Sequence, residues 1–348
     1  MKILKIFFQA FLLTFCFNAN AKNITILATG GTISGAGSSA IESQYSSSKI
    51  DINQIIKNSP GIDKLANIEA EQIMQVASQD MSPSTWISIA NKVNEVLSRS
   101  AVDGVIITHG TDTMEETAYF LSLTVKSKKP VILVGSMRPS TSLSADGAIN
   151  LYNAVALAAS AQASAKGALI LMNDEIFAAR DAAKTHTTNV ASFKSSNSGA
   201  IGFVHYGKVE IYYNPTRTHS VKSIFDVRKT DSLPKVEIVF AYAGIDSGVI
   251  DHLVASGAKA IILAGVGDGN INKASLDRLK EARKKGVIIV RSSHLGSGAV
   301  ARNSEINDDQ LDFVTADNLS PQKARILTML ALMKTSDAKK IEEIFRTY

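Results

Sequence analysis

Short apolar runs alternate along most of the chain with segments in which apolar residues recur at helical spacing. The runs are rich in Val, Ile and Leu and show no strict alternation with polar residues, which is typical of strands covered on both faces. The pattern predicts strands at Ile24–Thr29, Gln72–Ala77, Gly104–Thr108, Pro130–Gly135, Gly167–Asn173, Val236–Tyr242, Lys259–Ala264 and Gly286–Val290.

The intervening segments predict amphipathic helices. Ser82–Ser98 begins with a serine suited to the N-cap, followed by proline at the first helical position. Thr113–Ser127 and Lys273–Lys285 continue the series, and Ser320-Pro321 opens another helix. Strands that alternate with helices indicate parallel sheets with helices on both faces.

This order predicts an α/β protein of two domains. The larger, N-terminal domain (22–212) would be flavodoxin-like, with a mostly parallel sheet and helices on both faces. The smaller, C-terminal domain (235–348) would be a parallel α/β unit. Residues 213–234 are polar, contain little helical period and are interpreted as the linker between them.

The first residues predict a secretory signal peptide over 1–21. Lys2 and Lys5 precede an apolar run of about a dozen residues, too short to span a bilayer, and an A-x-A cleavage pattern follows at residues 19–21. A buried N-terminal helix is one alternative. A lipid anchor on Cys16 is another, but the bulky Phe15 before it counts against an anchor. No later stretch is apolar enough to cross a membrane.

Composition excludes several classes of protein. The 348 residues include 45% hydrophobic and 20% charged residues, which is ordinary for a globular protein. Loss of Lys2 and Lys5 lowers the formal net charge from +5 to +3, and this mild, dispersed basicity is no nucleic-acid footprint. The one cysteine would leave with the signal peptide, so neither a disulfide framework nor a cysteine-based zinc site is expected.

Polar chemistry follows the predicted strands at their carboxyl ends, where open parallel sheets bind ligands. Four segments would therefore share one rim: Gly30-Gly31-Thr32, Ser78-Gln79-Asp80, His109-Gly110-Thr111-Asp112-Thr113 and Arg180–Lys184. Taken alone, each has a structural explanation as a turn, a loop or a helix cap. Together they present hydroxyl groups, amides, a carboxylate and an amine.

Thr32 is a candidate nucleophile, because a threonine hydroxyl becomes reactive when a neighbouring group takes its proton. Thr111, Asp112 and Lys184 form a second candidate group, since a lysine kept from water can act as a base. Residues 34–48 contain seven serines and follow the Gly-Gly turn directly, which favours a mobile lid.

Other kinds of site find little support in the sequence. The six histidines lack metal-ligand spacing, so no metal is expected. Gly265–Asn270 departs from the dinucleotide fingerprint at its last position, and neither a phosphate loop nor a nucleophile elbow is present, so no cofactor is expected.

Two long motifs, in this order, resemble those of the bacterial type II L-asparaginases, and the likeness covers essentially the whole mature chain. The first motif is residues 28–33 (ATGGTI) and the second is residues 107–117 (ITHGTDTMEET). The resemblance implies a periplasmic amidohydrolase of two α/β domains that forms a homotetramer and converts L-asparagine to L-aspartate and ammonia, with side activity on L-glutamine.

The resemblance also implies a role for each site residue. Thr32 would be the nucleophile with Tyr45 of the lid close by, and Thr111 with Lys184 would form the second catalytic group. Ser78 and Gln79 would hold the substrate's carboxylate and amine side, and Asp112 its ammonium. Asn270 and Glu305 would reach in from a neighbouring subunit. Asp268 stands where some relatives carry asparagine, which leaves that position's hydrogen-bonding role open.

Two other functions stay open at this point. A periplasmic amino-acid-binding protein would share the signal peptide, the two domains and a polar cleft, but would need no pair of threonines with a lysine. An amidohydrolase acting on a peptide or on glutaminyl-transfer-RNA is the second, and export argues against the latter substrate.

Overall fold

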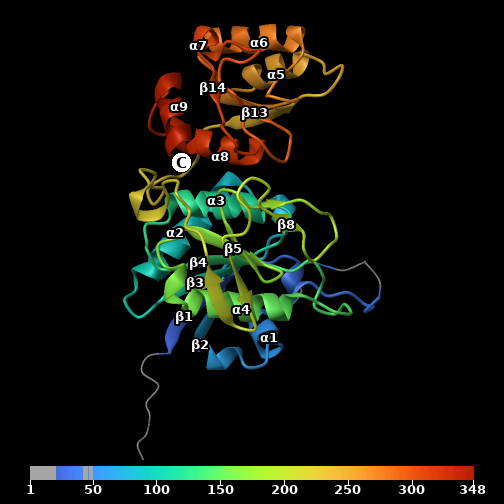
Figure 1. The fold of residues 1–348 in the computed structure, drawn as a ribbon, viewed down its shortest axis with the longest axis vertical. Helices are drawn as coiled ribbons and strands as arrows, with labels where there is room; N and C mark the ends of the chain where they lie inside the picture. The colour runs from blue at the N-terminus through green and yellow to red at the C-terminus, as the bar shows by residue number, and fades with distance from the viewer. Residues whose placement is uncertain (1–20, 42–45, 47–49) are drawn as a thin grey trace, which may run out of the picture.

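The computed structural model describes residues 21–41, 46 and 50–348; the signal peptide expected at 1–21 lies outside this range except for its last residue. In the described residues, strands form one sheet of eight, one sheet of four and a two-stranded ribbon. The two sheets lie one above the other along the long axis of the molecule (Figure 1). The chain is therefore a two-domain α/β fold with a larger N-terminal and a smaller C-terminal sheet.

The larger sheet is parallel at its centre and antiparallel toward one edge. β2, β1, β3, β4 and β5 run parallel, whereas β6, β9 and β10 pair antiparallel. In spatial order the strands are β10 (Lys208–Ile211), β9 (Gly202–His205), β6 (Glu175–Ala178), β5 (Ala168–Met172), β4 (Val131–Val134), β3 (Gly104–Thr108), β1 (Lys22–Ala28) and β2 (Ala66–Gln72).

Both faces of the central strands β3, β4 and β5 are buried, which explains the unbroken apolar runs. In β3, Ile106 points into a core formed with α1 (Ile52–Lys57) and α4 (Gly147–Ala159), while its neighbours Val105 and Ile107 point into the opposite core with α2 (Pro83–Ser98) and α3 (Met114–Thr124). Helices therefore cover each side.

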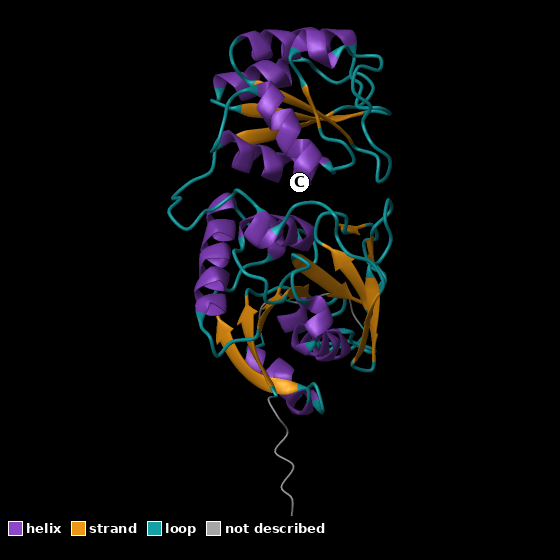
Figure 2. Cartoon of the chain, turned by 60° about the vertical axis from the view of Figure 1, so that its left-hand side comes forward, coloured by secondary structure: helices purple, strands orange, loops and turns teal. Residues whose placement is uncertain are grey.

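The smaller sheet is entirely parallel. It consists of β11 (Val236–Phe240), β12 (Ala260–Gly265), β13 (Ile288–Ser293) and β14 (Val314–Thr315) in that order. Helices lie along both of its sides (Figure 2). They are α5 (Gly248–Ala255), α6 (Lys273–Lys284), α7 (Asp308–Leu311), α8 (Pro321–Leu332) and α9 (Ala338–Thr347).

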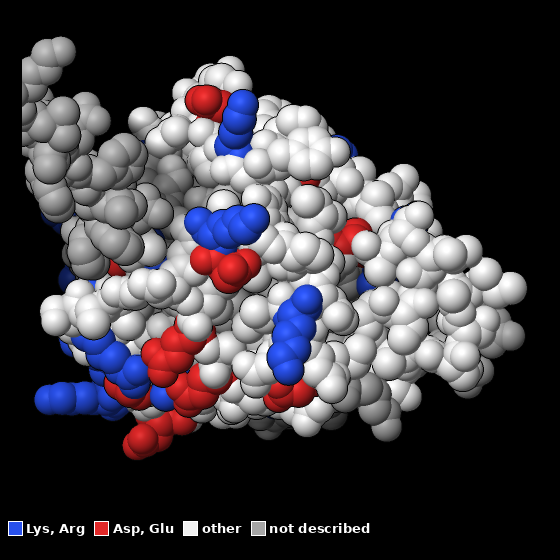
Figure 3. All heavy atoms as spheres, turned by 90° about the horizontal axis from the view of Figure 1, so that it is seen from below, with Lys and Arg blue, Asp and Glu red and all other residues white. Residues whose placement is uncertain are grey.

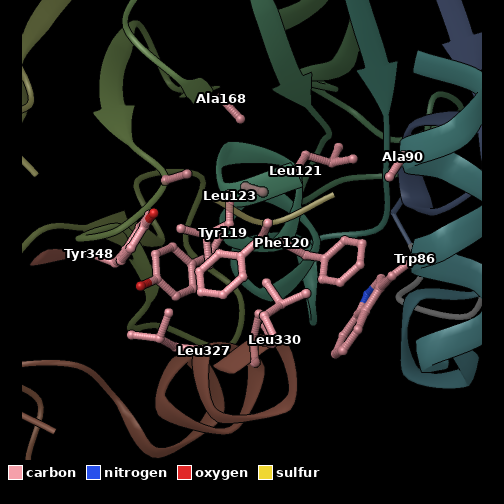
Figure 4. Packing of buried hydrophobic residues seen from close by; sticks show 14 of the residues in the cluster. Trp86, Ala90, Tyr119, Phe120, Leu121, Leu123, Ala168, Leu327, Leu330 and Tyr348 are labelled. Carbon is pink, nitrogen blue, oxygen red and sulfur yellow. The ribbon is translucent and has the colours of Figure 1, made fainter. Parts of the chain in front are cut away.

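Helix α8 joins the two halves through one continuous apolar core. It packs against β11 and β12 of the smaller sheet and against α3 of the larger half. Figure 4 shows Leu327 and Leu330 of α8 facing Tyr119 and Phe120 of α3, and all four belong to the same buried cluster. Each Å² of apolar surface buried in this core contributes about 25 cal/mol to stability, and this burial holds the two sheets together.

The helix starts follow the signals in the sequence. The Ser82 hydroxyl accepts from the backbone N–H of Thr85, and Ser320 accepts from that of Lys323; proline occupies the first helical position in both cases. Helix α6 ends in Arg283 and Lys284, which suits the negative end of the helix dipole. These helix predictions are confirmed.

One predicted strand is wrong. Gln72–Ala77 is not a strand, because β2 spans Ala66–Gln72 and ends where that prediction began. β2 lies at the sheet edge and is half exposed, so its own sequence is polar and carries no apolar run. Ile73 and Met74, which drew the prediction, pack against the core from irregular backbone. The other predicted strands match β1, β3, β4, β5, β11, β12 and β13 within a few residues.

The antiparallel strands β6, β9 and β10 and the ribbon β7 (Ala183–Lys184) with β8 (Phe193–Lys194) were not predicted. Residues 213–234 contain, as regular structure, a single short 3-10 helix, η5 (Ser220–Lys222). The domain limits given above stay a prediction.

Charges of both signs lie side by side on the end of the molecule near the larger sheet (Figure 3), in keeping with the small formal net charge. Among the described residues, no helix combines the length and apolar character required to cross a bilayer.

Candidate active site

The predicted rim exists at the carboxyl ends of β1 and β3. β1 runs through a Gly-Gly turn into the 3-10 helix η1 (Thr32–Ser34), and β3 runs into residues 109–113 ahead of α3. The side chains of Thr32 and Thr111 are both buried. Adjacent parallel strands bring these two loops together, as β1 and β3 are neighbours in the sheet.

The two loops touch through their backbones. Gly31 has a φ of +90°, and a Cβ placed there would come within 2.4 Å of the Gly110 nitrogen. A Cβ on Gly110 would in turn come within 2.6 Å of the Ser78 hydroxyl. Both glycines are therefore required by close approach. Three segments from distant parts of the chain meet here without room for another side chain.

Ser78 is bound to the second loop in two ways. Its hydroxyl accepts from the backbone N–H of Asp112 at 3.3 Å, and its carbonyl accepts from the Thr113 hydroxyl at 2.6 Å. Ser78 begins the 3-10 helix η3 (Ser78–Asp80), on which Gln79 is exposed. Although the strand predicted before it is wrong, Ser78 lies in the expected place.

Lys184 joins the group from the ribbon strand β7. Its ammonium nitrogen lies 2.8 Å from the Thr111 hydroxyl and 2.6 Å from Oδ1 of Asp112. The side chain of Lys184 is mostly buried, whereas that of Asp112 is 59% exposed. A lysine at this distance from a hydroxyl can exchange a proton with it directly. Asp112 thus forms an ion pair with the lysine.

Glu115 makes a contact with Lys184 that the sequence did not predict. Its Oε2 accepts from the backbone N–H of Lys184 at 2.5 Å, so the first turn of α3 holds the backbone of the lysine whose side chain reaches Thr111. Asp112, Glu115, Lys184 and Gln322 are among the residues that line a surface hollow of about 500 Å³.

His109 supports the second loop from beneath. It is fully buried, with Nδ1 2.7 Å from the Gly110 carbonyl and Nε2 2.9 Å from the Thr117 hydroxyl. Because a carbonyl only accepts, Nδ1 carries the proton, and Nε2 accepts from Thr117. The Thr117 oxygen then accepts from the indole N–H of Trp86. Burial lowers the pKa of His109 to about 4, which keeps it neutral in this chain.

Asn270, Glu305 and Asp268 lie elsewhere, in loops of the smaller-sheet half. Asn270 ends a tight turn bridged to Val266, and Glu305 is exposed. Oδ1 of Asp268 accepts from the backbone N–H of Ala301 at 2.7 Å, so its side chain ties two loops together. The chain thus brings Thr32, Ser78, Thr111, Asp112 and Lys184 to the larger sheet, but places Asn270 and Glu305 with the smaller one.

Buried Arg291 fixes the turn that carries Asn270. It pairs with Asp308 at 2.7 Å, both side chains being 0% exposed, and it donates to the carbonyl of Asp268 at 3.2 Å. Oδ1 of Asn270 is buried without a hydrogen-bond partner among the described residues.

Tyr45 lies outside the described residues, as does much of the expected lid; Ala36 and Ser46 form an isolated bridge within it. In the part of the chain that the structure describes, no group of three or more His, Cys, Asp or Glu side chains could hold a metal ion.

Fold and site together define a two-domain α/β protein with a threonine–lysine centre at the carboxyl edge of its larger sheet. Two family models match in succession: "Asparaginase, N-terminal" at residues 23–217 and "Glutaminase/Asparaginase C-terminal domain" at residues 235–345. The chain belongs to the asparaginase family.

Curated relatives match over nearly their full length. The chain is 47% identical to the probable periplasmic L-asparaginase of Haemophilus influenzae over 95% of this chain and 94% of the relative. It is 47% identical to L-asparaginase 2 of Escherichia coli over 94% of this chain and 93% of that relative. It is also 47% identical to the glutaminase-asparaginase of Pseudomonas fluorescens biotype A over 94% of this chain and 90% of that relative.

A solved structure agrees. The crystal structure named as a probable cytoplasmic L-asparaginase from Campylobacter jejuni has a TM-score of 0.91 and 49% sequence identity, covering 94% of this chain and 100% of that one. The expected family and fold class are confirmed.

Proposed function

We propose that this protein is an L-asparaginase, which hydrolyses the side-chain carboxamide of L-asparagine to L-aspartate and ammonia. The observation that carries the proposal is the contact of Lys184 with Thr111 and Asp112, one loop away from the Gly31-Thr32 turn. Membership of the asparaginase family and the names of the relatives support the same activity. A glutaminase side activity follows the names of other relatives.

Thr32 is the nucleophile in this proposal. Its hydroxyl oxygen attacks the carboxamide carbon, its proton passes to the departing nitrogen, and the C–N bond breaks to release ammonia and leave an acyl ester on Thr32. Water then hydrolyses that ester to give aspartate and restores the hydroxyl. Direct attack by water on the carboxamide is the competing mechanism, and Thr32 would then only orient the substrate.

Thr111 and Lys184 move the proton. A correctly placed general acid or base contributes about 10²–10⁴-fold in rate. Backbone N–H groups near Thr32 and at the start of α3 supply the oxyanion contacts, each of which is typically worth roughly 3–4 kcal/mol.

The remaining contacts would hold a small zwitterion. Ser78 and Gln79 take its α-carboxylate and amine side. Asp112 takes the α-ammonium; since Oδ1 contacts Lys184, we assign Oδ2 to the substrate. Tyr45 and residues 34–48 would close over the bound substrate.

Asn270 and Glu305 would complete the site of a neighbouring subunit in a homotetramer built from dimers. Their position in loops of the smaller-sheet half fits a role outside their own chain's site. The apolar leader at 1–21 supports export to the periplasm, and the relative from Haemophilus influenzae is named periplasmic, although the solved neighbour is named cytoplasmic.

Ammonia release tests the activity. The purified protein is supplied with L-asparagine, D-asparagine, L-glutamine and D-glutamine, and ammonia is measured for each. We expect turnover of L-asparagine. Binding of L-asparagine without ammonia would instead identify an amino-acid-binding protein, an alternative that the reported relatives, all named as enzymes, do not support.

The fate of Thr32 separates the two mechanisms. Acid-quenched enzyme, mixed with a slowly hydrolysed substrate, should carry an acyl adduct on Thr32 in mass spectrometry. Absence of the adduct under conditions that preserve esters would favour direct attack by water.

A further inference from the structure

The short segment Arg180–Lys184 crosses the junction between the two halves of the molecule. It follows β6 of the larger sheet and ends at Lys184, the lysine that reaches Thr111. The Arg180 side chain and the carbonyl groups of Arg180 and Ala182 nevertheless contact residues of the smaller-sheet half. The position of Lys184 therefore depends on residues that lie far from it in the sequence.

Lys323 makes the most unusual of these contacts. It is the third residue of α8 and is only 2% exposed. Its ammonium donates to the carbonyl of Arg180 at 2.9 Å and also to that of Ala182. Ala182 itself is fully buried and lies two residues before Lys184.

A charged lysine is an unfavourable choice at this place. Burial removes its hydration and lowers its pKa to about 8, partly opposed by the charges of Glu115 and Asp181. The first turn of a helix also carries the positive end of the dipole, which disfavours a cation. A methionine would fill similar space without either penalty. Residues that break local rules in this way are often retained for function.

Three other contacts hold the same segment. Arg180 donates to Oδ1 of Asn318 at 2.6 Å and to the carbonyl of Tyr348 at 2.9 Å, both in the smaller-sheet half. On the opposite side, Glu115 accepts from the backbone N–H of Lys184. Fixed points thus occur at residues 180, 182 and 184, on both sides of the segment.

We propose that Lys323 is a positioning residue for the reaction: by holding the carbonyls of Arg180 and Ala182, it fixes the backbone from which Lys184 reaches Thr111 and Asp112. The inference rests on the proposed function of Lys184. Through Lys323, the smaller-sheet half completes the site of its own chain's larger sheet. α8 is suited to this task because it packs against α3, whose N-terminus follows Thr111 and Asp112 (Figure 4).

The expected effect follows from the sensitivity of catalysis to alignment. A displacement of about 1 Å can reduce a rate by about 10²-fold. Lys323→Met keeps the volume but removes all donors, so the Lys184 backbone should relax. We expect kcat for L-asparagine to fall at least about tenfold while KM changes less than about twofold, because Lys323 contacts none of the segments that carry Ser78, Gln79 and Asp112.

A double-variant cycle distinguishes positioning from general damage. If Lys323 acts through Lys184, then Lys323→Met should cost little further activity in a Lys184→Met background, less than about twofold. The matched control is Thr328→Val, which removes a fully buried hydroxyl from the same helix without contacting 180–184. It should keep wild-type kcat.

Hydrogen exchange gives a readout that requires no turnover. Mass spectrometry should show faster exchange of amides 182–186 in Lys323→Met, and unchanged exchange there in Thr328→Val. If Lys323→Met does not fold, Asn318→Ala loosens the same segment through Arg180 and should show the same two effects at smaller size.

The outcomes separate cleanly. A folded Lys323→Met or Asn318→Ala protein with wild-type kcat and wild-type exchange at 182–186 overturns the inference. So does an equal loss of activity with and without Lys184. If the wild-type protein releases no ammonia, the proposed function fails, while the exchange experiment still decides whether Lys323 fixes the segment.

Discussion

The ammonium of Lys184 lies 2.8 Å from the hydroxyl of Thr111, although 73 residues separate them in the chain. β3 and α3 hold the threonine, while a two-stranded ribbon, Glu115 and Lys323 hold the lysine. A contact built from so many elements is preformed, which reduces the reorganisation required when charge develops during reaction.

Removal of either reactive group should stop hydrolysis without unfolding the protein. Thr32→Val and Lys184→Met should each lower kcat/KM for L-asparagine at least about a hundredfold, because each deletes a nucleophile or a proton-transfer group. Ammonia release and circular dichroism measure the two effects. Lys194→Met, on the paired strand of the same ribbon, is the control and should retain activity. Near-normal turnover in either variant would remove that residue from the mechanism.

A methyl group at Gly110 should damage substrate binding. The added Cβ would lie 2.6 Å from the Ser78 hydroxyl and push it away from Asp112. Since Ser78 is proposed to hold the substrate, Gly110→Ala should raise KM about tenfold or more, equivalent to about 1.4 kcal/mol of binding. Gly296→Ala, where nothing lies within 4 Å of the new Cβ, is the matched control. Equal kinetics for the two variants would contradict the assignment of Ser78.

Acid should destabilise the protein partly through His109. Its pKa is about 4 in the folded chain, against an ordinary value of 6.5. Between these values the unfolded chain binds the proton and the folded chain does not, so stability falls as pH drops from about 6.5 to about 4. The contribution is roughly 3 kcal/mol.

Urea unfolding at several pH values measures how the free energy of unfolding depends on His109. His109→Gln should show a shallower loss of unfolding free energy across that window than the wild type. His252→Gln, at an exposed position on α5, should leave the slope unchanged. The same slope in all three proteins would show that His109 does not drive acid sensitivity.

The buried pair Arg291–Asp308 should be costly to break and cheaper to replace. Asp308→Ala leaves a buried guanidinium without its partner, which typically costs about 3–5 kcal/mol. Arg291→Met combined with Asp308→Leu should cost less, because no charge is left buried. Urea unfolding compares them. Asp226→Asn, in an exposed pair with Arg228, should barely change stability. If the double variant were less stable than Asp308→Ala, this account of the pair would be wrong.

Trimming of residues 35–48 should reduce turnover more than stability if they close over the substrate. Ammonia release and thermal unfolding give the two quantities. An unchanged kcat with a shortened segment would exclude a lid function.

The sequence predicted the central parallel strands, which are buried on both faces. β1, β3, β4 and β5 were visible because uninterrupted Val, Ile and Leu runs are required where helices cover both sides. β2 was misplaced because an edge strand such as Ala66–Gln72 needs no such run. The short antiparallel strands β6 and β9 were missed because four residues are too few to show a period, although each forms a tight hairpin with a neighbour in sequence: β6 with β5 through Asn173-Asp174, and β9 with β10 through Tyr206-Gly207.

Only some of the candidate site residues could be predicted from the sequence. Thr32, Thr111 and Lys184 stand out by type, position and resemblance. Lys323 and Glu115 do not, because a lysine or glutamate on a helix usually faces solvent, and only the folded chain shows their contacts with 180–184.

The outer strands of the larger sheet, β2 and β10, carry Glu69, Glu71, Lys208 and Glu210. Unpaired strand edges are templates for cross-β aggregation, and charged side chains along them oppose it. Charged side chains on both edge strands thus oppose pairing with a strand of another molecule. We expect concentrated solutions of the protein to resist fibril growth near neutral pH.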